Sequence, residues 1–197
     1  MKWFALLAAL ALSAQAGEMA VADVEGKMQR PLADAGQVAT VLFFVLHDCP
    51  ISNGYAPEIS RIAQEYAGRG VRSYVVYGEG DLAPAEAQKH ARDYGYRCPA
   101  LLDPPHALAR VAGATVAPEA AVFSAKGELL YRGRIDDRVA SLGVHRAEPK
   151  ERDLRAALDA VLAGKPVRER FTKAIGCYLP QSAETSAPSK ASPAPQP

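Results

Sequence analysis

The sequence predicts an α/β fold built on a mixed central sheet, and three observations lead to that class. A continuous apolar run over residues 38–46 is typical of a central strand covered on both faces. Strand and helix patterns then alternate along the chain, which predicts parallel strands joined by helical crossovers. Two later strand patterns joined by Ala125-Lys126-Gly127 have the form of a hairpin, so the sheet is expected to become antiparallel there.

Each element has its own local signal. After the first strand, apolar residues recur at helical spacing over residues 59–66 and stop at Gly68. Pro84 and Pro105 suit the first turns of two further helices, and Gly164 suits the end of the last one. The expected strands are residues 38–46, 71–77, 99–102, 119–124 and 128–133, and the later expected helices are residues 84–94, 105–112 and 154–162.

Composition divides the chain into three parts. Residues 1–16 contain a basic start, an apolar stretch and a small-residue cleavage pattern, which together predict a signal peptide. The mature chain is therefore expected to be exported, with the bacterial periplasm as its compartment; an uncleaved anchor is the alternative. Residues 17–180 are long enough for one domain with a sizeable core. Residues 181–197 are mostly Ser, Ala and Pro, and we expect this tail to be disordered.

Charge and cysteine content narrow the possible functions. The formal net charge is +1 and there is no basic stripe, which argues against nucleic acid as a partner. No membrane association is expected once the signal peptide is removed. Three cysteines in an exported chain leave at least one unpaired, which fits either a reactive thiol or, at Cys98, a buried inert one.

The segment Cys49-Pro50-Ile51-Ser52 is the strongest candidate for a reactive site. Cys49 comes after the first predicted strand and at the start of the first predicted helix, whose partial positive charge stabilises a thiolate. Asp48 opposes this effect, because a neighbouring anion disfavours the charged sulfur. The fourth position is Ser52, which can hydrogen-bond a thiolate but cannot attack a disulfide. Cys49 is therefore the predicted nucleophile.

Topology predicts which residues share an edge with Cys49. Sites in sheets of this kind form outside the carboxyl ends of the parallel strands. The loop at residues 78–81 and Asp103 are expected on that edge, whereas Cys98 precedes a parallel strand and falls at the opposite one. Cys98 is thus a poor disulfide partner for Cys49, since the two α-carbons must approach within about 7 Å.

The second strand of the hairpin should return to the same edge. It delivers Arg134, Asp136, Asp137 and Arg138 there. The two arginines are candidates for stabilising a thiolate. The two aspartates are either an acid–base pair or structural elements of a loop.

Residues 21–180 resemble the thioredoxin-like superfamily and, within it, the redoxin or peroxiredoxin-like branch of alkyl hydroperoxide reductase and thiol-specific antioxidant proteins. The resemblance implies a three-layer α/β/α thioredoxin-like fold with a mixed central sheet. It also implies a thiol–disulfide oxidoreductase acting on a protein or small-molecule thiol or disulfide partner. The matching pieces are Phe43-Phe44-Val45, Cys49-Pro50, Pro57, Pro99-Ala100-Leu101-Leu102-Asp103-Pro104, Ala117-Pro118 and Lys126-Gly127-Glu128-Leu129, together with residues 49–55 and 131–137.

The same resemblance implies roles for individual residues. Pro118 would be a cis-proline facing Cys49, with backbone groups turned toward the sulfur to hydrogen-bond a substrate strand; an ordinary trans proline is the alternative. The candidate substrate-binding residues are Pro50, Ala117, Arg134, Asp136 and Asp137.

The chain departs from the peroxiredoxin pattern in front of Cys49. Peroxiredoxins carry a threonine three residues before the reactive cysteine, and this chain has Leu46 there. Leucine cannot donate a hydrogen bond to a peroxide oxygen. A one-cysteine peroxidase is therefore the first alternative function, and Leu46 argues against it.

A resolving thiol is available further along the chain. Cys177 follows the last helix, and the segment at residues 165–175 is long enough to reach back over the active-site edge. A Cys49–Cys177 pair would restore a dithiol cycle of thiolate attack, mixed disulfide and release. The alternative is that Cys177 is a small apolar residue that holds the tail against the domain.

The second alternative is a non-catalytic copper-binding or copper-delivery module. His47, His145 and Cys49 would supply two imidazoles and one sulfur. Copper-carrying relatives of the fold have a second cysteine four residues after the first, where this chain has Asn53. We therefore predict no resident metal or cofactor, and interpret His90 and His106 as ordinary helical residues.

Overall fold

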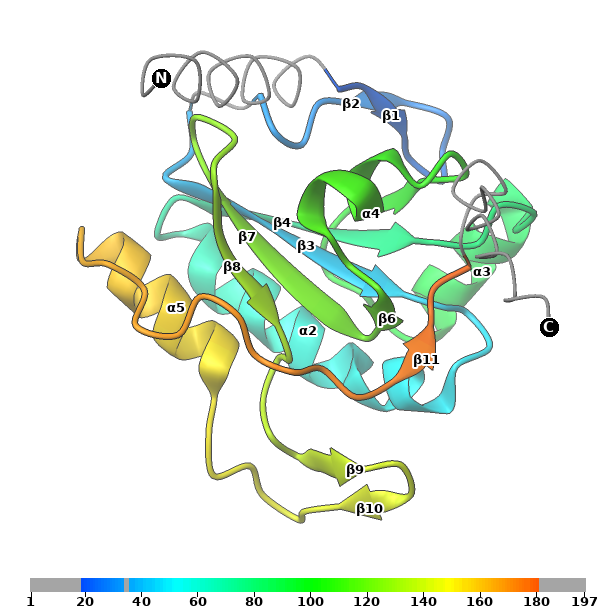
Figure 1. Cartoon of the computed structure of the whole chain (residues 1–197). Helices are drawn as coiled ribbons and strands as arrows, with labels where there is room; N and C mark the ends of the chain where they lie inside the picture. The colour runs from blue at the N-terminus through cyan, green and yellow to red at the C-terminus, as the bar shows by residue number, and fades with distance from the viewer. Residues whose placement is uncertain (1–18, 34–35, 181–197) are drawn as a thin grey trace, which may run out of the picture.

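The computed structural model describes residues 19–33 and 36–180, and its centre is a five-stranded mixed sheet in the order β5-β4-β3-β7-β8 (Figure 1). Strands β3, β4 and β5 are parallel, and β7 runs antiparallel to both β3 and β8. The predicted mixed sheet is confirmed, with strand ends within one residue of those expected. The strands are β3 Ala39–Val45, β4 Val71–Tyr77, β5 Ala100–Leu102, β7 Glu119–Ser124 and β8 Leu129–Gly133.

Helices cover both faces of the sheet, which confirms the three-layer α/β/α thioredoxin-like fold. One core cluster joins the sheet to α2, α3 and α5, and a second joins the opposite face to α4. Every residue of β3 is buried, and alternate side chains enter the two clusters, as with Phe43 and Phe44. The helices are α2 Pro50–Ala67, α3 Pro84–Asp93, α4 Ala107–Ala112 and α5 Asp153–Leu162.

Three small two-stranded sheets lie outside the central one, and sequence patterns did not predict them. Their strands have two or three residues, too few for an alternation to register. His145, the candidate copper ligand, belongs to β10 in one of these sheets. The strands are β1 Val21–Ala22 with β2 Met28–Gln29, β9 Val139–Ser141 with β10 Val144–His145, and β6 Val116–Ala117 with β11 Cys177–Tyr178.

Residues 170–179, here called the C-terminal strap, cross the molecule from the end of β8 to β6 (Figure 1). Beside β8, the Arg132 amide donates to the Arg170 carbonyl and the Thr172 amide donates to the Arg132 carbonyl. The strap then forms β11, which pairs antiparallel with β6. A segment far from Cys49 in sequence is thereby brought to the edge where the parallel strands end.

The predicted signal peptide at residues 1–16 and the predicted disordered tail at residues 181–197 lie outside the described residues. Among the helices within residues 19–33 and 36–180, none combines the length and apolar character needed to cross a membrane.

Candidate functional site

Cys49 is the residue that precedes the first turn of α2. It caps the helix with an extended backbone, Pro50 occupies the first turn, and no acidic residue lies in that turn. The positive end of the helix therefore faces the sulfur, which favours the thiolate when Cys49 is reduced. Cys49 is only 1% exposed, so other residues shield it from solvent.

Cys177 shields Cys49 and forms a disulfide with it. Their α-carbons are 6.3 Å apart, within the range that a disulfide spans. The pairing that the sequence left open is therefore present in the structure. Cys177 itself is only partly buried, because it lies on the outer side of the bond.

The peptide bond between Ala117 and Pro118 is cis, as the resemblance implied. The Cys49 sulfur lies 3.6 Å from the Ala117 carbonyl oxygen. On the next strand, Cys177 is the pairing partner of Ala117. Both cysteines and the residue before the cis-proline therefore meet at one point of the backbone.

Ser52 and Pro50 have different surroundings. Ser52 is fully buried, and its hydroxyl accepts a 3.5 Å hydrogen bond from the Leu46 amide, which holds the loop in front of Cys49. Pro50 is exposed beside the disulfide. Pro50 is thus placed where a partner can touch it, whereas Ser52 stabilises the loop from inside.

Asp136 and Asp137 are both buried, and the carboxylate of each accepts hydrogen bonds. Asp136 accepts from the Tyr55 hydroxyl at 2.6 Å and from the Arg138 amide at 3.0 Å. Burial, helped by the nearby Asp136 carboxylate, raises the pKa of Tyr55 above its usual range. Asp137 accepts backbone hydrogen bonds from Lys150 and Glu151, which lower the pKa of its carboxyl. These contacts favour the structural interpretation of the two aspartates over the acid–base one.

Arg134 makes a two-pronged ion pair with Asp153 at the start of α5, with nitrogen–oxygen distances of 2.7 and 3.0 Å. This pair ties the end of β8 to that helix. Arg134 and Asp136 also line a small cavity with Pro118 and Ile175 under the strap. The predicted loop therefore does reach the cis-proline, although the Arg134 guanidinium is already paired with Asp153.

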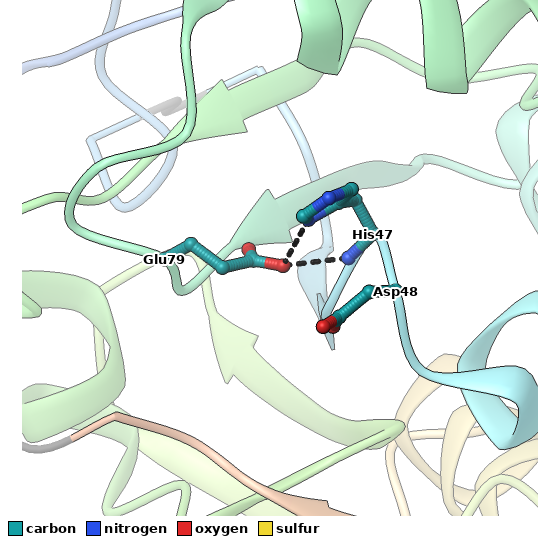
Figure 2. Close-up of side chains that lie close together, drawn as sticks. All are labelled: His47, Asp48 and Glu79. Carbon is teal, nitrogen blue, oxygen red and sulfur yellow. Dashed lines mark hydrogen bonds and ion pairs between the residues drawn. The ribbon is translucent and has the colours of Figure 1, made fainter.

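His47 and Glu79 form a polar contact beside the site (Figure 2). The Glu79 carboxylate accepts hydrogen bonds from the His47 amide at 2.6 Å and from its ring at 3.0 Å. Sequence analysis placed the loop of Glu79 on this edge but gave the residue no role. His47, Asp48 and Glu79 together form a group of possible metal ligands. Each offers one ligand atom, and these atoms all lie within 4.8 Å of one another.

The copper alternative required Cys49, His47 and His145 together. In the described part of the chain, no group of three such side chains contains Cys49 or His145. The Cys49 sulfur is instead bonded to Cys177. This arrangement gives the copper-binding hypothesis no support.

His90 lies in α3, as predicted, and its ring makes contacts that the sequence did not predict. Its ring is buried and lies 2.7 Å from the Tyr77 hydroxyl and 2.9 Å from the Asn53 side-chain oxygen. Asn53 in turn donates to the carbonyl of His47. Burial lowers the pKa of His90 from its usual value. The chain of contacts joins α3 to the loop before Cys49.

The prediction that His106 is a helical residue is wrong. It is the residue that precedes α4, and its backbone has a φ of 52°, in the left-handed region. It lies outside the helix that was expected to contain it. The helix begins at Ala107, two residues after the expected start at Pro105, and the Asp103 carboxylate accepts hydrogen bonds from the amides of Ala107 and Ala109 in its first turn.

Cys98 is unpaired and precedes β5, at the edge opposite Cys49, as predicted. Burial raises the pKa of its thiol to about 12. A thiol that stays protonated near neutral pH is a poor nucleophile, which matches the inert role.

The fold and the site together define a class: a redoxin with a thioredoxin-like fold, whose cysteine pair lies between a helix start and a cis-proline. The AhpC/TSA family matches residues 12–132, more than half of the 197 residues, and the chain belongs to that family. The matched stretch contains Cys49 and Pro118 and ends before Cys177. No curated protein matches the chain.

Several solved structures resemble this one. An uncharacterized conserved protein from Geobacillus kaustophilus is 28% identical with a TM-score of 0.71, over 84% of this chain and 89% of that one. A hypothetical protein from Sinorhizobium meliloti is 25% identical with a TM-score of 0.69, over 84% and 91%. A secreted disulfide oxidoreductase from Mycobacterium tuberculosis, described as homologous to E. coli DsbE, shares the fold at 15% identity, with a TM-score of 0.52 over 76% and 98%.

Proposed function

We propose that this protein is an exported thiol–disulfide oxidoreductase in which Cys49 is the nucleophile and Cys177 the resolving thiol. The observation that carries the proposal is the Cys49–Cys177 disulfide, held at the start of α2 against the backbone beside the cis-proline. If the disulfide served only to hold the C-terminal strap in place, Cys49 would not need to lie at the start of a helix.

The exchange reaction needs no other redox group. In the reduced protein the Cys49 thiolate attacks a partner disulfide, forms a mixed disulfide and releases one partner sulfur as a thiolate. The Cys177 thiolate then attacks the Cys49 sulfur, which closes the Cys49–Cys177 bond and releases the second partner thiolate. Two electrons pass from the protein to the partner, and the reverse sequence oxidises a partner dithiol.

The surroundings suit these steps. The start of α2 stabilises the Cys49 thiolate both as nucleophile and as leaving group. The Ala117 carbonyl beside the sulfur and the exposed Pro50 provide a surface for a partner segment. The secreted oxidoreductase from M. tuberculosis shares the fold, and together with the signal-peptide pattern this supports an exported protein acting on protein thiols or disulfides.

The peroxidase alternative is less well supported. Leu46 is 5% exposed and belongs to the core cluster around Cys49, so no side-chain hydrogen-bond donor stands where the peroxiredoxin threonine would be. Ser52, whose hydroxyl is the nearest to Cys49 in sequence, is fully buried and accepts a hydrogen bond from the Leu46 amide.

Substitution of the cysteines tests the proposal. Cys49→Ser is expected to abolish reduction of a protein disulfide such as that of insulin, because the nucleophile is lost. Cys177→Ser is expected to accumulate a mixed disulfide on Cys49, because resolution is lost. Cys98→Ser is the matched control and should leave the rate unchanged. Full activity in Cys49→Ser would overturn the proposal.

A further inference from the structure

The strap approaches Cys49 as an added β-strand. Cys177 pairs with Ala117 and Tyr178 with Val116, and the Leu179 amide donates to the Thr115 carbonyl at 3.0 Å. Three consecutive residues thus use the backbone of β6 and of the turn before it. An extended segment with its cysteine at this register brings its sulfur onto Cys49 by backbone pairing alone.

Side chains at this edge impose a sequence pattern on whatever occupies it. Gly176 packs so closely on the Ala117 carbonyl that a Cβ there would overlap it. Leu179 is 6% exposed and sits against Gly78, where an added Cβ would lie 2.8 Å from the leucine methyl. Tyr178, between them, is 85% exposed. The edge therefore accepts glycine, then cysteine, then any residue, then a large aliphatic residue.

The resemblance already implies that the backbone beside the cis-proline binds a substrate strand; we propose that the edge of β6 selects a partner segment of the pattern Gly-Cys-x-aliphatic, and that residues 176–179 are a tethered copy of that segment. The inference rests on the proposed function and specifies its partner. In a mixed disulfide the partner sulfur takes the position on Cys49 that the Cys177 sulfur holds in this structure. The partner backbone and the strap consequently compete for the same edge.

The strap is suited to such replacement. Its last residues are held by the disulfide, by the backbone pairs of β11 and by one buried side chain, Leu179. Its earlier part is held separately beside β8, where the Tyr131 hydroxyl lies 2.7 Å from that of Thr172. Once the disulfide is reduced, the end of the strap can leave β6 while the strap stays attached to β8.

Peptides carrying an activated cysteine test the pattern on the full-length Cys177→Ser variant. The probes are Gly-Cys-Tyr-Leu, Gly-Cys-Ala-Leu, Ala-Cys-Tyr-Leu and Gly-Cys-Tyr-Asp, each linked through its cysteine to thionitrobenzoate. Attack by the Cys49 thiolate forms a Cys49–peptide disulfide and releases the thionitrobenzoate anion, whose absorbance gives the rate. The first two probes should react equally fast, and the last two at least about tenfold more slowly, because burying a leucine side chain or adding an overlapping Cβ changes the free energy by more than about 1.4 kcal/mol.

Competition by the strap gives an independent readout. Adding Leu179→Asp to Cys177→Ser should raise the rate with Gly-Cys-Tyr-Leu, because the strap then leaves the edge more often. Tyr178→Ala is the matched control and should change nothing, since that side chain is exposed. A thermal melt of each variant establishes that it is folded.

The outcomes separate the two proposals. Equal rates for all four peptides, with Cys49 reactive, would overturn the sequence pattern and leave the oxidoreductase intact. Reaction with dithionitrobenzoate but with no peptide would overturn the docking site alone. No reaction of Cys49 with any of these disulfides would show that it is not a nucleophile, and the proposed function would fail first.

Discussion

Cys49, the proposed nucleophile, is buried although it would have to meet a partner, and the reason lies in the residues around it. Its sulfur is covered by the disulfide to Cys177 and by the backbone at Ala117. The sequence pattern located Cys49 and the helix that follows it, and the resemblance to thioredoxin-like proteins implied the cis-proline. The sequence pattern also placed Cys98 at the far edge. The contacts that Glu79 and His90 make near Cys49 were not predicted, because contacts between elements distant in sequence leave no periodic signal.

The His90 ring is expected to be neutral in the folded protein down to a pH below its usual pKa of 6.5. The Asn53 oxygen accepts from Nε2, so Nδ1 is left to accept from the Tyr77 hydroxyl. Because the folded-state pKa is depressed, the unfolded chain takes up a proton first as the pH falls. The free energy of unfolding should therefore decline as the pH drops below 6.5. Above pH 6.5, His90 should cause no change of stability with pH.

An NMR titration of the histidine rings checks this directly, together with unfolding in urea at several pH values. His90→Gln should flatten the decline. His145→Gln, which removes an exposed ring on β10, is the control and should leave it as it is. A His90 midpoint at or above 6.5 would contradict the prediction.

At the scale of elements, β6 has only two residues yet positions both the cis-proline and the strap. Buried Glu119 supports it, since its carboxylate accepts from the Thr115 amide at 2.9 Å and pairs with Arg132 at 3.5 Å. Burial raises the pKa of Glu119 above its usual value, because a charged carboxylate is less stable away from water. No strand signal predicts β6, because its conformation depends on these contacts rather than on alternation.

Replacing this support should weaken both stability and exchange. Glu119→Ala removes the hydrogen bond to the Thr115 amide and should lower the free energy of unfolding by about 0.5–1.5 kcal/mol. The rate of protein disulfide reduction should fall as well, because β6 no longer holds the docking edge. Glu119→Gln, which keeps an acceptor, should show a smaller loss of both.

Urea unfolding and an insulin reduction assay give the two readouts. Glu128→Ala, an exposed glutamate in the hairpin on the same sheet, is the matched control for losing a carboxylate. If Glu119→Ala were as stable and as active as the wild type, Glu119 would have no supporting role.

At the scale of the whole molecule, the strap encloses most of the chain in one covalent loop. The bonded cysteines are 128 residues apart. The mixed sheet could be predicted because its long apolar strands and the helices between them each carry their own pattern, and the resemblance implied the three-layer arrangement. The path of the strap could not, because residues 165–180 have no regular periodicity and their place depends on pairing with β8 and β6. The distance along the chain allowed a Cys49–Cys177 bond but could not choose it.

Closing so long a loop restricts the unfolded chain, so the oxidised protein should be more stable than the reduced one by about 2–4 kcal/mol. Urea unfolding with and without a reductant measures the difference. Cys98→Ser should show the same difference, because that residue takes no part in the bond. Cys177→Ser should match the reduced wild type under both conditions. Equal stability of the two redox forms would contradict the prediction.

The two bonded cysteines differ in exposure, and this difference predicts an order of electron transfer. Cys177 is partly exposed, whereas Cys49 is 1% exposed. A reductant thiolate is therefore expected to attack the Cys177 sulfur and to displace Cys49 as the helix-stabilised leaving thiolate. Electrons would enter the protein at Cys177 and leave it through Cys49. The donor and the acceptor would then meet different residues, so one surface need not recognise both.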